Sequence, residues 1–178
     1  MKKILTFDFA RRTGWCFGCP GEEPRFGSIR FASAGASHEA IFGHAINWAQ
    51  AMFTELAPDQ YVYEEPMQFR GGKSRAGNDE IAYGLPAIIQ GVAHNLGIHD
   101  ARKARVQDVR LHFIHRNPKR EIAKRETMQR CRLFGWEVRD DNEADACALW
   151  HYACTSQDSK LAIQTSDLFL PRTAGSMP

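Results

Sequence analysis

The sequence predicts a single α/β domain in which helices flank a mixed sheet of five strands. Three observations support this fold. Strand-like segments separated by short turns open the chain, an amphipathic helical segment links them to another short strand, and one more strand precedes the C-terminal helical segments. Short turns give antiparallel pairing and a connecting helix allows parallel pairing, so we expect a mixed sheet.

The first strand carries the residue around which the chain is organised. Alternation in the run ILTFDF places Leu5 and Phe7 on one face of the strand, and Thr6 and Asp8 on the other. A carboxylate on a central strand costs free energy unless it is paired, hydrogen-bonded or bound to a metal. From the strand alone, a structural Asp8 that caps the next turn and a functional Asp8 are equally good explanations.

The remaining elements follow from periodicity and from helix and turn signals. We expect a turn over 11–14, and Ser37 is suited to cap the first helix. One domain is expected over 1–156, and the polar segment 157–178 is expected to be a poorly ordered tail. The expected strands cover 4–9, 15–18, 25–33, 60–64 and 98–104, and the expected helices cover 38–56, 78–96, 106–115, 121–134 and a segment that begins near residue 140.

Charge is distributed unevenly along the chain. The whole sequence has a formal charge of +2, but 102–132 holds eleven basic and three acidic residues, a charge of +8, which leaves −6 elsewhere. A basic block of this kind inside a folded region is typical of a protein that binds a phosphate backbone. The glycine-rich loop after residue 66 is also basic. The basic candidates for nucleic-acid contact are Arg70, Lys73, Arg75, Arg105, Lys119, Arg120 and Lys124.

Composition also bounds the location of the protein. No run is long and apolar enough to cross a bilayer, and the N-terminal residues lead directly into a strand, so we expect no membrane association. The odd number of cysteines, five, suits reduced thiols. We therefore expect a cytoplasmic protein.

Two further acidic motifs accompany Asp8. Glu64 ends the strand 60–64, and ligand sites in open α/β sheets lie at such strand ends. Asp145 falls in the second turn of the last helix among small and apolar residues, where capping does not explain it. Asp141 and Asn142 precede it by four and three residues, so either can share its face. Asp140 and Glu143 have the spacing of a capping box.

Oxygen ligands on two strands and a late helix suit a hard divalent cation, Mg²⁺ or Mn²⁺. Two such ions can activate water and stabilise the leaving oxygen in phosphodiester hydrolysis. The chain shows no obvious His or Cys nucleophile motif, which fits direct attack by water. The residues therefore predict a metal-dependent hydrolase that acts on a polyanion.

With these acidic motifs, the sequence resembles the RuvC-type Holliday-junction resolvases of the RNase H-like superfamily. The runs ILTFDFARRTGW, YVYEEPM and NEADACALW look like the family's three acidic motifs, in the same order, and the match extends over about residues 3–154. The chain departs from the family at Phe9-Ala10, where the family often has Pro-Gly.

The resemblance implies an RNase H-like fold, a homodimer, and paired nicking of opposing strands in a four-way DNA junction. It makes Asp8, Glu64 and Asp145 catalytic metal ligands, with Asn142 or Asp141 as the fourth. Lys124 matches a basic position that would contact phosphate or stabilise charge. Phe69 resembles the aromatic residue that probes the junction centre. The small residues of 78–96 could serve sheet packing, which we favour, or a two-fold seam.

Three other functions remain open at this stage. A junction-binding protein with a degraded site is suggested by Asn142, where the family has an acidic residue or His. An RNase H-like nuclease could act on RNA or on other DNA branches. An actin-like phosphotransferase shares the opening with Asp8 and Gly14, but the chain is short for two such lobes.

Overall fold

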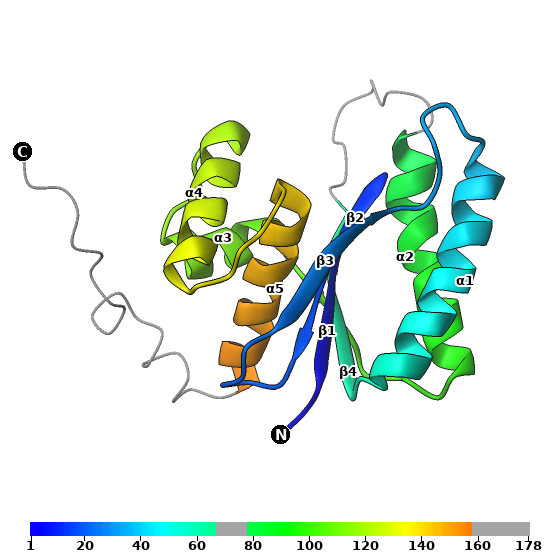
Figure 1. Ribbon diagram of the computed structural model, residues 1–178, viewed down its shortest axis with the longest axis horizontal. Helices are drawn as coiled ribbons and strands as arrows, with labels where there is room; N and C mark the ends of the chain where they lie inside the picture. The colour runs from blue at the N-terminus through cyan, green and yellow to red at the C-terminus, as the bar shows by residue number, and fades with distance from the viewer. Residues whose placement is uncertain (67–77, 158–178) are drawn as a thin grey trace, which may run out of the picture.

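The computed structural model describes residues 1–66 and 78–157. They form a layered α/β fold in which the sheet lies between two groups of helices (Figure 1). The elements in chain order are β1 (Ile4–Asp8), β2 (Arg12–Gly18), β3 (Arg25–Arg30), α1 (His38–Leu56), β4 (Gln60–Glu64), α2 (Asn78–Asn95), β5 (Ala101–Ala104), α3 (Val106–Ile114), α4 (Arg120–Leu133) and α5 (Asp141–Gln157).

The sheet has the order β3-β2-β1-β4-β5, with β1 at its centre. The first three strands form an antiparallel meander, and β4 and β5 run parallel to β1. This confirms the predicted mixed five-stranded sheet. In such a sheet the carboxyl ends of β1 and β4 meet at one edge.

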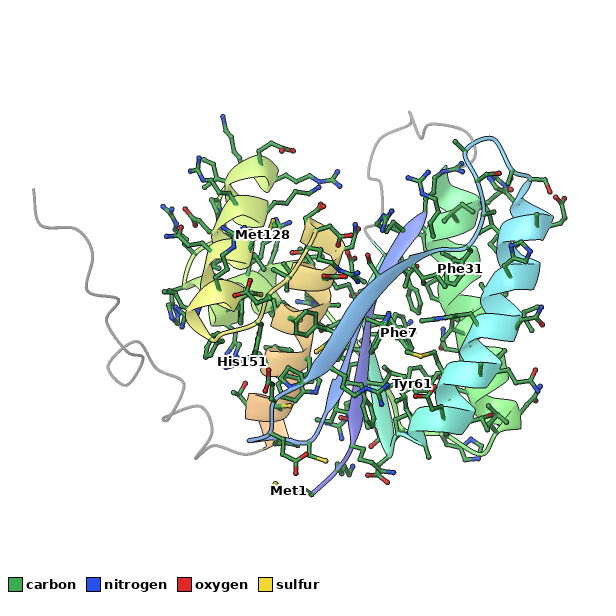
Figure 2. All side chains as sticks on the ribbon, viewed as in Figure 1. Met1, Phe7, Phe31, Tyr61, Met128 and His151 are labelled. Carbon is green, nitrogen blue, oxygen red and sulfur yellow. The ribbon has the colours of Figure 1, made fainter. Side chains whose placement is uncertain are left out.

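The two faces of β1 contact different helices, as the alternation predicts. Leu5 and Phe7 are fully buried against α1 and α2, and Figure 2 shows Phe7 and Tyr61 on this side of the sheet. Ile4 packs on the other face with residues of α5. Figure 1 shows α3, α4 and α5 on that face and α1 and α2 on the opposite one.

Four predicted strand boundaries were wrong. β1 ends at Asp8 rather than at residue 9. The turn lies at residues 9–11, because the Thr13 hydroxyl donates to the Ala10 carbonyl oxygen at 3.0 Å, so β2 begins at Arg12 rather than at 15. β3 ends at Arg30 rather than at 33. β5 begins at Ala101 rather than at 98, since Ile98 packs into the apolar core before the strand starts.

The helix ends agree more closely with the predictions from the sequence. Ser37 caps α1 by accepting from the Ala40 amide at 3.4 Å. In α2, a Cβ on Gly84 would lie 2.5 Å from Cζ of Phe42 in α1. The small residue at 84 therefore serves packing between α1 and α2. Ala93 of the same helix is fully buried with Leu5 and Tyr61, which is the packing on the sheet that we favoured.

An aromatic cluster fixes the basic helices to the rest of the fold. Phe113 of α3, Phe134 and Trp136 stack at centroid distances of 4.8 to 6.4 Å, and His151 of α5 lies against all three. The predicted tail lies outside the described residues except for Gln157, which ends α5. Within the described part of the chain, no helix is long and apolar enough to cross a membrane.

Candidate active site

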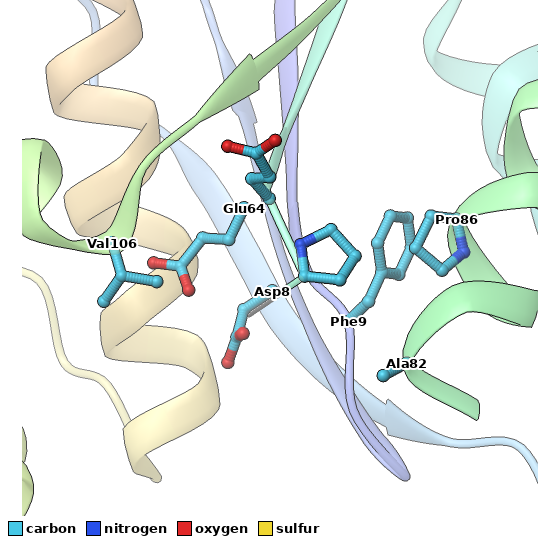
Figure 3. Close-up of a pocket in the computed structure, with 8 residues that line it drawn as sticks. Asp8, Phe9, Glu64, Ala82, Pro86 and Val106 are labelled. Carbon is cyan, nitrogen blue, oxygen red and sulfur yellow. The ribbon is translucent and has the colours of Figure 1, made fainter. Parts of the chain in front are cut away.

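Asp8 and Glu64 lie side by side at the carboxyl edge of the sheet. Each is the last residue of its strand, and the preceding residues Phe7 and Tyr63 are partners in the parallel ladder. Figure 3 shows the two carboxylates near each other, with the Phe9 ring on the far side of Asp8. The strand ends thus position two carboxyl groups without help from a flexible loop.

Helix α5 brings the third carboxylate to the same edge. The Thr6 hydroxyl in β1 donates to the carbonyl oxygen of Ala146 at 2.8 Å, which fixes the helix against the central strand. Gly14, the partner of Asp8 in the ladder, faces the start of α5 so closely that a Cβ would lie 1.9 Å from the Asn142 carbonyl oxygen. These two contacts place Asp145 beside Asp8.

The N-terminus of α5 is held by a cap that β2 and β3 support. Asp140 accepts from the Glu143 amide at 2.9 Å and from the Ser28 hydroxyl at 2.7 Å, and Arg12 lies 3.5 Å from it. The cap of the predicted box is confirmed. The reciprocal hydrogen bond of a capping box, from the Asp140 amide to the side chain of Glu143, is replaced. The buried Glu143 accepts from the backbone N–H and the side chain of Arg139 instead.

One cavity of about 290 Å³ contains the acidic residues together with cations. Asp8, Glu64 and Asp145 line it, as do both candidates for the fourth ligand. Its basic residues come from α3 and α4. They are Arg110, Arg120 and Lys124.

The electrostatics of this cavity follow from carboxyl groups that share a poorly solvated space. Loss of solvation, with Asp145 and Asp141 nearby, raises the pKa of Asp8 to about 8. Loss of solvation, with Asp8 and Asp145 nearby, raises the pKa of Glu64 well above its ordinary value. The pKa of Asp145 rises to about 6 for the same main reason, although Arg110 opposes the rise. A cation at this point would relieve all three shifts.

Lys124 forms an ion pair with Asp141. A hydrogen bond from the lysine lowers the pKa of this carboxyl group, so Asp141 stays ionised while its neighbours are driven towards the neutral form. Lys124 therefore lies at the acidic site, as the resemblance implies. Asn142 lines the same cavity without a charge.

Arg110 is the site residue that the sequence analysis missed. It lies in α3, lines the cavity, and opposes the rise in the pKa values of both Glu64 and Asp145. In the sequence it is one of eleven basic residues between 102 and 132, and nothing in its spacing sets it apart. Its position four residues into the helix that follows β5 is a weak signal that could have found it.

The other predicted nucleic-acid contacts divide into two groups. Arg120 and Lys124 line the cavity, whereas Arg105 and Lys119 are exposed and do not. Four further candidates lie outside the described residues. These are Phe69, Arg70, Lys73 and Arg75.

The donor chemistry of the cavity fits a hard divalent cation. Between residues 1–66 and 78–157, no three acidic, His or Cys side chains form a complete ligand set around one point. Mg²⁺ does not require such a set, because it keeps several waters and is commonly held by one or two carboxylates and substrate phosphate. Asp8, Glu64 and Asp145 are the residues that would hold it.

Comparison with known proteins identifies similar folds among solved structures. No family model and no curated protein matches the sequence. Among solved structures, Thermus thermophilus RuvC is similar, with a TM-score of 0.65, 12% identity, and coverage of 88% of this chain and 96% of that one. The described chain has the RuvC fold. At this identity the likeness establishes the architecture, and the predicted RNase H-like, RuvC-type fold is confirmed.

Two further solved structures have this RuvC-like architecture. T. thermophilus RuvC in complex with a Holliday junction substrate has a TM-score of 0.66, 12% identity and the same coverage. The yeast mitochondrial Holliday junction resolvase Ydc2 has a TM-score of 0.58 and 11% identity, with 92% of this chain and 84% of that one covered.

Proposed function

We propose that this chain is a divalent-metal-dependent endonuclease that resolves four-way DNA junctions by paired phosphodiester hydrolysis. The observation that carries the proposal is the single cavity in which Asp8, Glu64 and Asp145 lie with three cations. The RuvC fold supports junction-resolving nuclease activity, since the similar solved structures are Holliday-junction resolvases.

The cations of the cavity give it affinity for phosphate. Arg110 and Arg120 can each donate two parallel hydrogen bonds to phosphate oxygens, whereas Lys124 acts as a point charge. A scissile phosphate in this cavity would lie between these donors and the carboxylates. The basic side chains would orient the phosphate and stabilise the additional negative charge that forms during hydrolysis.

The carboxylates of the cavity would bind the divalent cation. Asp8, Glu64 and Asp145 are driven towards protonation by loss of solvation and by one another, so they attract a cation strongly once they ionise. Bound Mg²⁺ or Mn²⁺ would supply activated water and stabilise the leaving oxygen. Asp141, held by Lys124, or Asn142 would complete the oxygen donors.

A junction requires cuts in two strands, so we further propose that two copies of the chain act together. A two-fold dimer would present one cavity to each of two opposing strands. Phe69, Arg70, Lys73 and Arg75, in the segment after Glu64, would then contact the junction near its branch point. A cytoplasmic location also remains a proposal.

The test compares substrates under matched conditions. Purified protein is incubated with labelled four-way junctions, Y-forks, linear duplexes and RNA–DNA hybrids, with Mg²⁺, Mn²⁺ or chelator. Symmetric nicks in the four-way junction, absent with chelator, would support the proposal. Preferred cleavage of hybrids or of other branches would indicate a different RNase H-like nuclease.

Binding without cleavage under any metal would favour the junction-binding alternative. One observation motivates that alternative: Asn142 lines the cavity as an uncharged residue, and Asp141 is engaged by Lys124. The proposal favours the enzyme because Asp8, Glu64 and Asp145 are all retained at the edge of the sheet.

A further inference from the structure

A second group of arginines lies beyond the same edge of the sheet, outside the catalytic cavity. Arg11 occupies the turn after β1, and Arg12 and Arg30 are direct partners in the β2–β3 ladder. All three are exposed. Arg11 and Arg30 line one cavity of about 160 Å³ together with residues 32–35 of the following loop.

The placement of these charges is unfavourable by itself. Like charges directly opposite each other in an antiparallel pair destabilise the sheet. Arg12 has an acidic neighbour, Asp140, at 3.5 Å. Neither Arg11 nor Arg30 forms an ion pair with any residue that the structure describes.

Several arginines distant from this edge are neutralised by carboxylates. At the opposite end of β3, Arg25 lies 3.1 Å from Glu55 of α1. Other arginines distant from this edge also have carboxylate partners. They are Arg102 with Asp100, Arg116 with Glu126, and Arg139 with Glu143. Arg11 and Arg30, by contrast, share one cavity without a carboxylate partner among the described residues, and they lie next to the edge that carries the catalytic carboxylates. An external anion is therefore expected there.

The ladder register gives the distances of Arg12 and Arg30 from Asp8, and Arg11 directly precedes Arg12 in the chain. Gly14 is the partner of Asp8, and Arg12 lies two residues further along β2. With a rise of about 3.4 Å per residue and about 5 Å between strands, Cα of Arg12 is about 8 Å from Cα of Asp8, and Cα of Arg30 is about 12 Å away. At about 3.4 Å of axial rise per nucleotide in one strand, this corresponds to about two to four nucleotides.

We propose that Arg11 and Arg30 form a second phosphate-binding site, which holds the DNA backbone about two to four nucleotides from the scissile phosphate. The proposal rests on the proposed function, because the scissile phosphate is placed at Asp8, Glu64 and Asp145. Arg110 and the α4 cations contact the strand on one side of the carboxylates. The arginines of the β1–β2 turn and β3 contact it on the other side, so the strand is held on both sides of the cut.

The first test measures the salt dependence of binding in buffer with chelator, so that no cleavage is required. The double variant Arg11→Ala/Arg30→Ala is compared with wild type and with Arg25→Ala, on a four-way junction and on a linear duplex. Each lost phosphate contact should reduce the slope of log affinity against log salt by about 0.9. The affinity loss of the double variant between 50 and 200 mM salt should therefore be about twelvefold smaller than that of wild type.

The control variant separates a site from general charge. Arg25 lies on the same strand but is paired with Glu55, so Arg25→Ala should keep the wild-type slope. A double variant with the wild-type slope would overturn the proposal, and so would an equal change in Arg25→Ala. Thermal unfolding of all variants confirms that each is folded.

The outcomes also distinguish this proposal from the function on which it rests. A wild-type chain that binds DNA but never cuts it, with a reduced slope in the double variant, would refute the nuclease and leave the arginine site standing. Normal cleavage with unchanged slopes would refute the arginine site alone. A wild-type chain that binds no DNA would refute both.

A second measurement locates the contact. Single methylphosphonate substitutions remove one phosphate charge at a time from the cleaved strand. Substitutions two to four nucleotides from the nick should weaken binding by wild type but cause no further loss in Arg11→Ala/Arg30→Ala. Equal losses in both proteins at every position would overturn the proposal.

Discussion

A single methyl group at Gly14 should displace the helix that carries Asp145. Gly14 lies in β2 opposite Asp8, and its Cα faces the backbone at the start of α5. A Cβ there would lie 1.9 Å from the Asn142 carbonyl oxygen and 2.5 Å from the carbonyl carbon. These are backbone atoms, so no rotamer change can relieve the clash.

The size of the displacement follows from the geometry. Contacts of Cβ with other heavy atoms are essentially never shorter than 3.0 Å, so strand and helix must separate by at least 1.1 Å, the difference between 3.0 and 1.9 Å. Overpacking of this kind typically costs about 1–3 kcal/mol of stability. A misplacement of about 1 Å in a catalytic group can reduce the rate about 10²-fold.

Urea unfolding and single-turnover cleavage of Gly14→Ala measure the two effects separately. Gly91→Ala is the matched control, because no atom lies within 4 Å of a Cβ at that position in α2. It should leave the rate unchanged and add up to about 1 kcal/mol through helix propensity. If Gly14→Ala has wild-type stability and rate, the docking of α5 through Gly14 is refuted.

Three further predictions concern charge and capping at the same edge. The pKa of Asp8 is raised from 3.8 to about 8, so this group binds more protons in the folded state than in the unfolded state between these pH values. Asp8 therefore destabilises the metal-free fold increasingly as pH rises through that window. Asp8→Asn should therefore gain stability over wild type as pH increases, measured by unfolding with chelator; a difference that is constant with pH would contradict this. Lys124→Ala should lower turnover about 10²-fold and raise the pKa of Asp141, measured by cleavage rate and by NMR titration, whereas Gln129→Ala, exposed on the same helix, should change neither. Asp140→Ala should cost about 1 kcal/mol in urea unfolding by removing the cap of α5, and an unchanged midpoint would exclude that role.

Local periodicity was sufficient to place the acidic residues of the candidate site on their strands and helix. The alternation of β1 placed Asp8 on the face that contacts α5, and the strand before Pro66 ended at Glu64. Parallel pairing of β1 and β4 then brings both to one edge without further information. The helix position of Asp145 was similarly readable, because an acidic residue in an otherwise apolar segment stands out.

The contacts that bring the three carboxylates together could not be predicted from the sequence. The close approach of Gly14 to Asn142 and the bond from Thr6 to Ala146 join residues more than a hundred positions apart. The same limit applies to Arg110, which enters the cavity only through the packing of α3. Turn boundaries failed for a different reason, since the side chain of Thr13 closes a shorter turn than composition suggests.

Cleavage of a labelled four-way junction in Mg²⁺ by wild type and by Asp8→Asn, with binding recorded in parallel, tests the central claim most directly. The account predicts symmetric nicks by wild type, and a variant that binds the junction with wild-type affinity but does not cut it. Equal cleavage by both proteins would contradict the assignment of Asp8, and an intact junction with both would contradict the proposed nuclease.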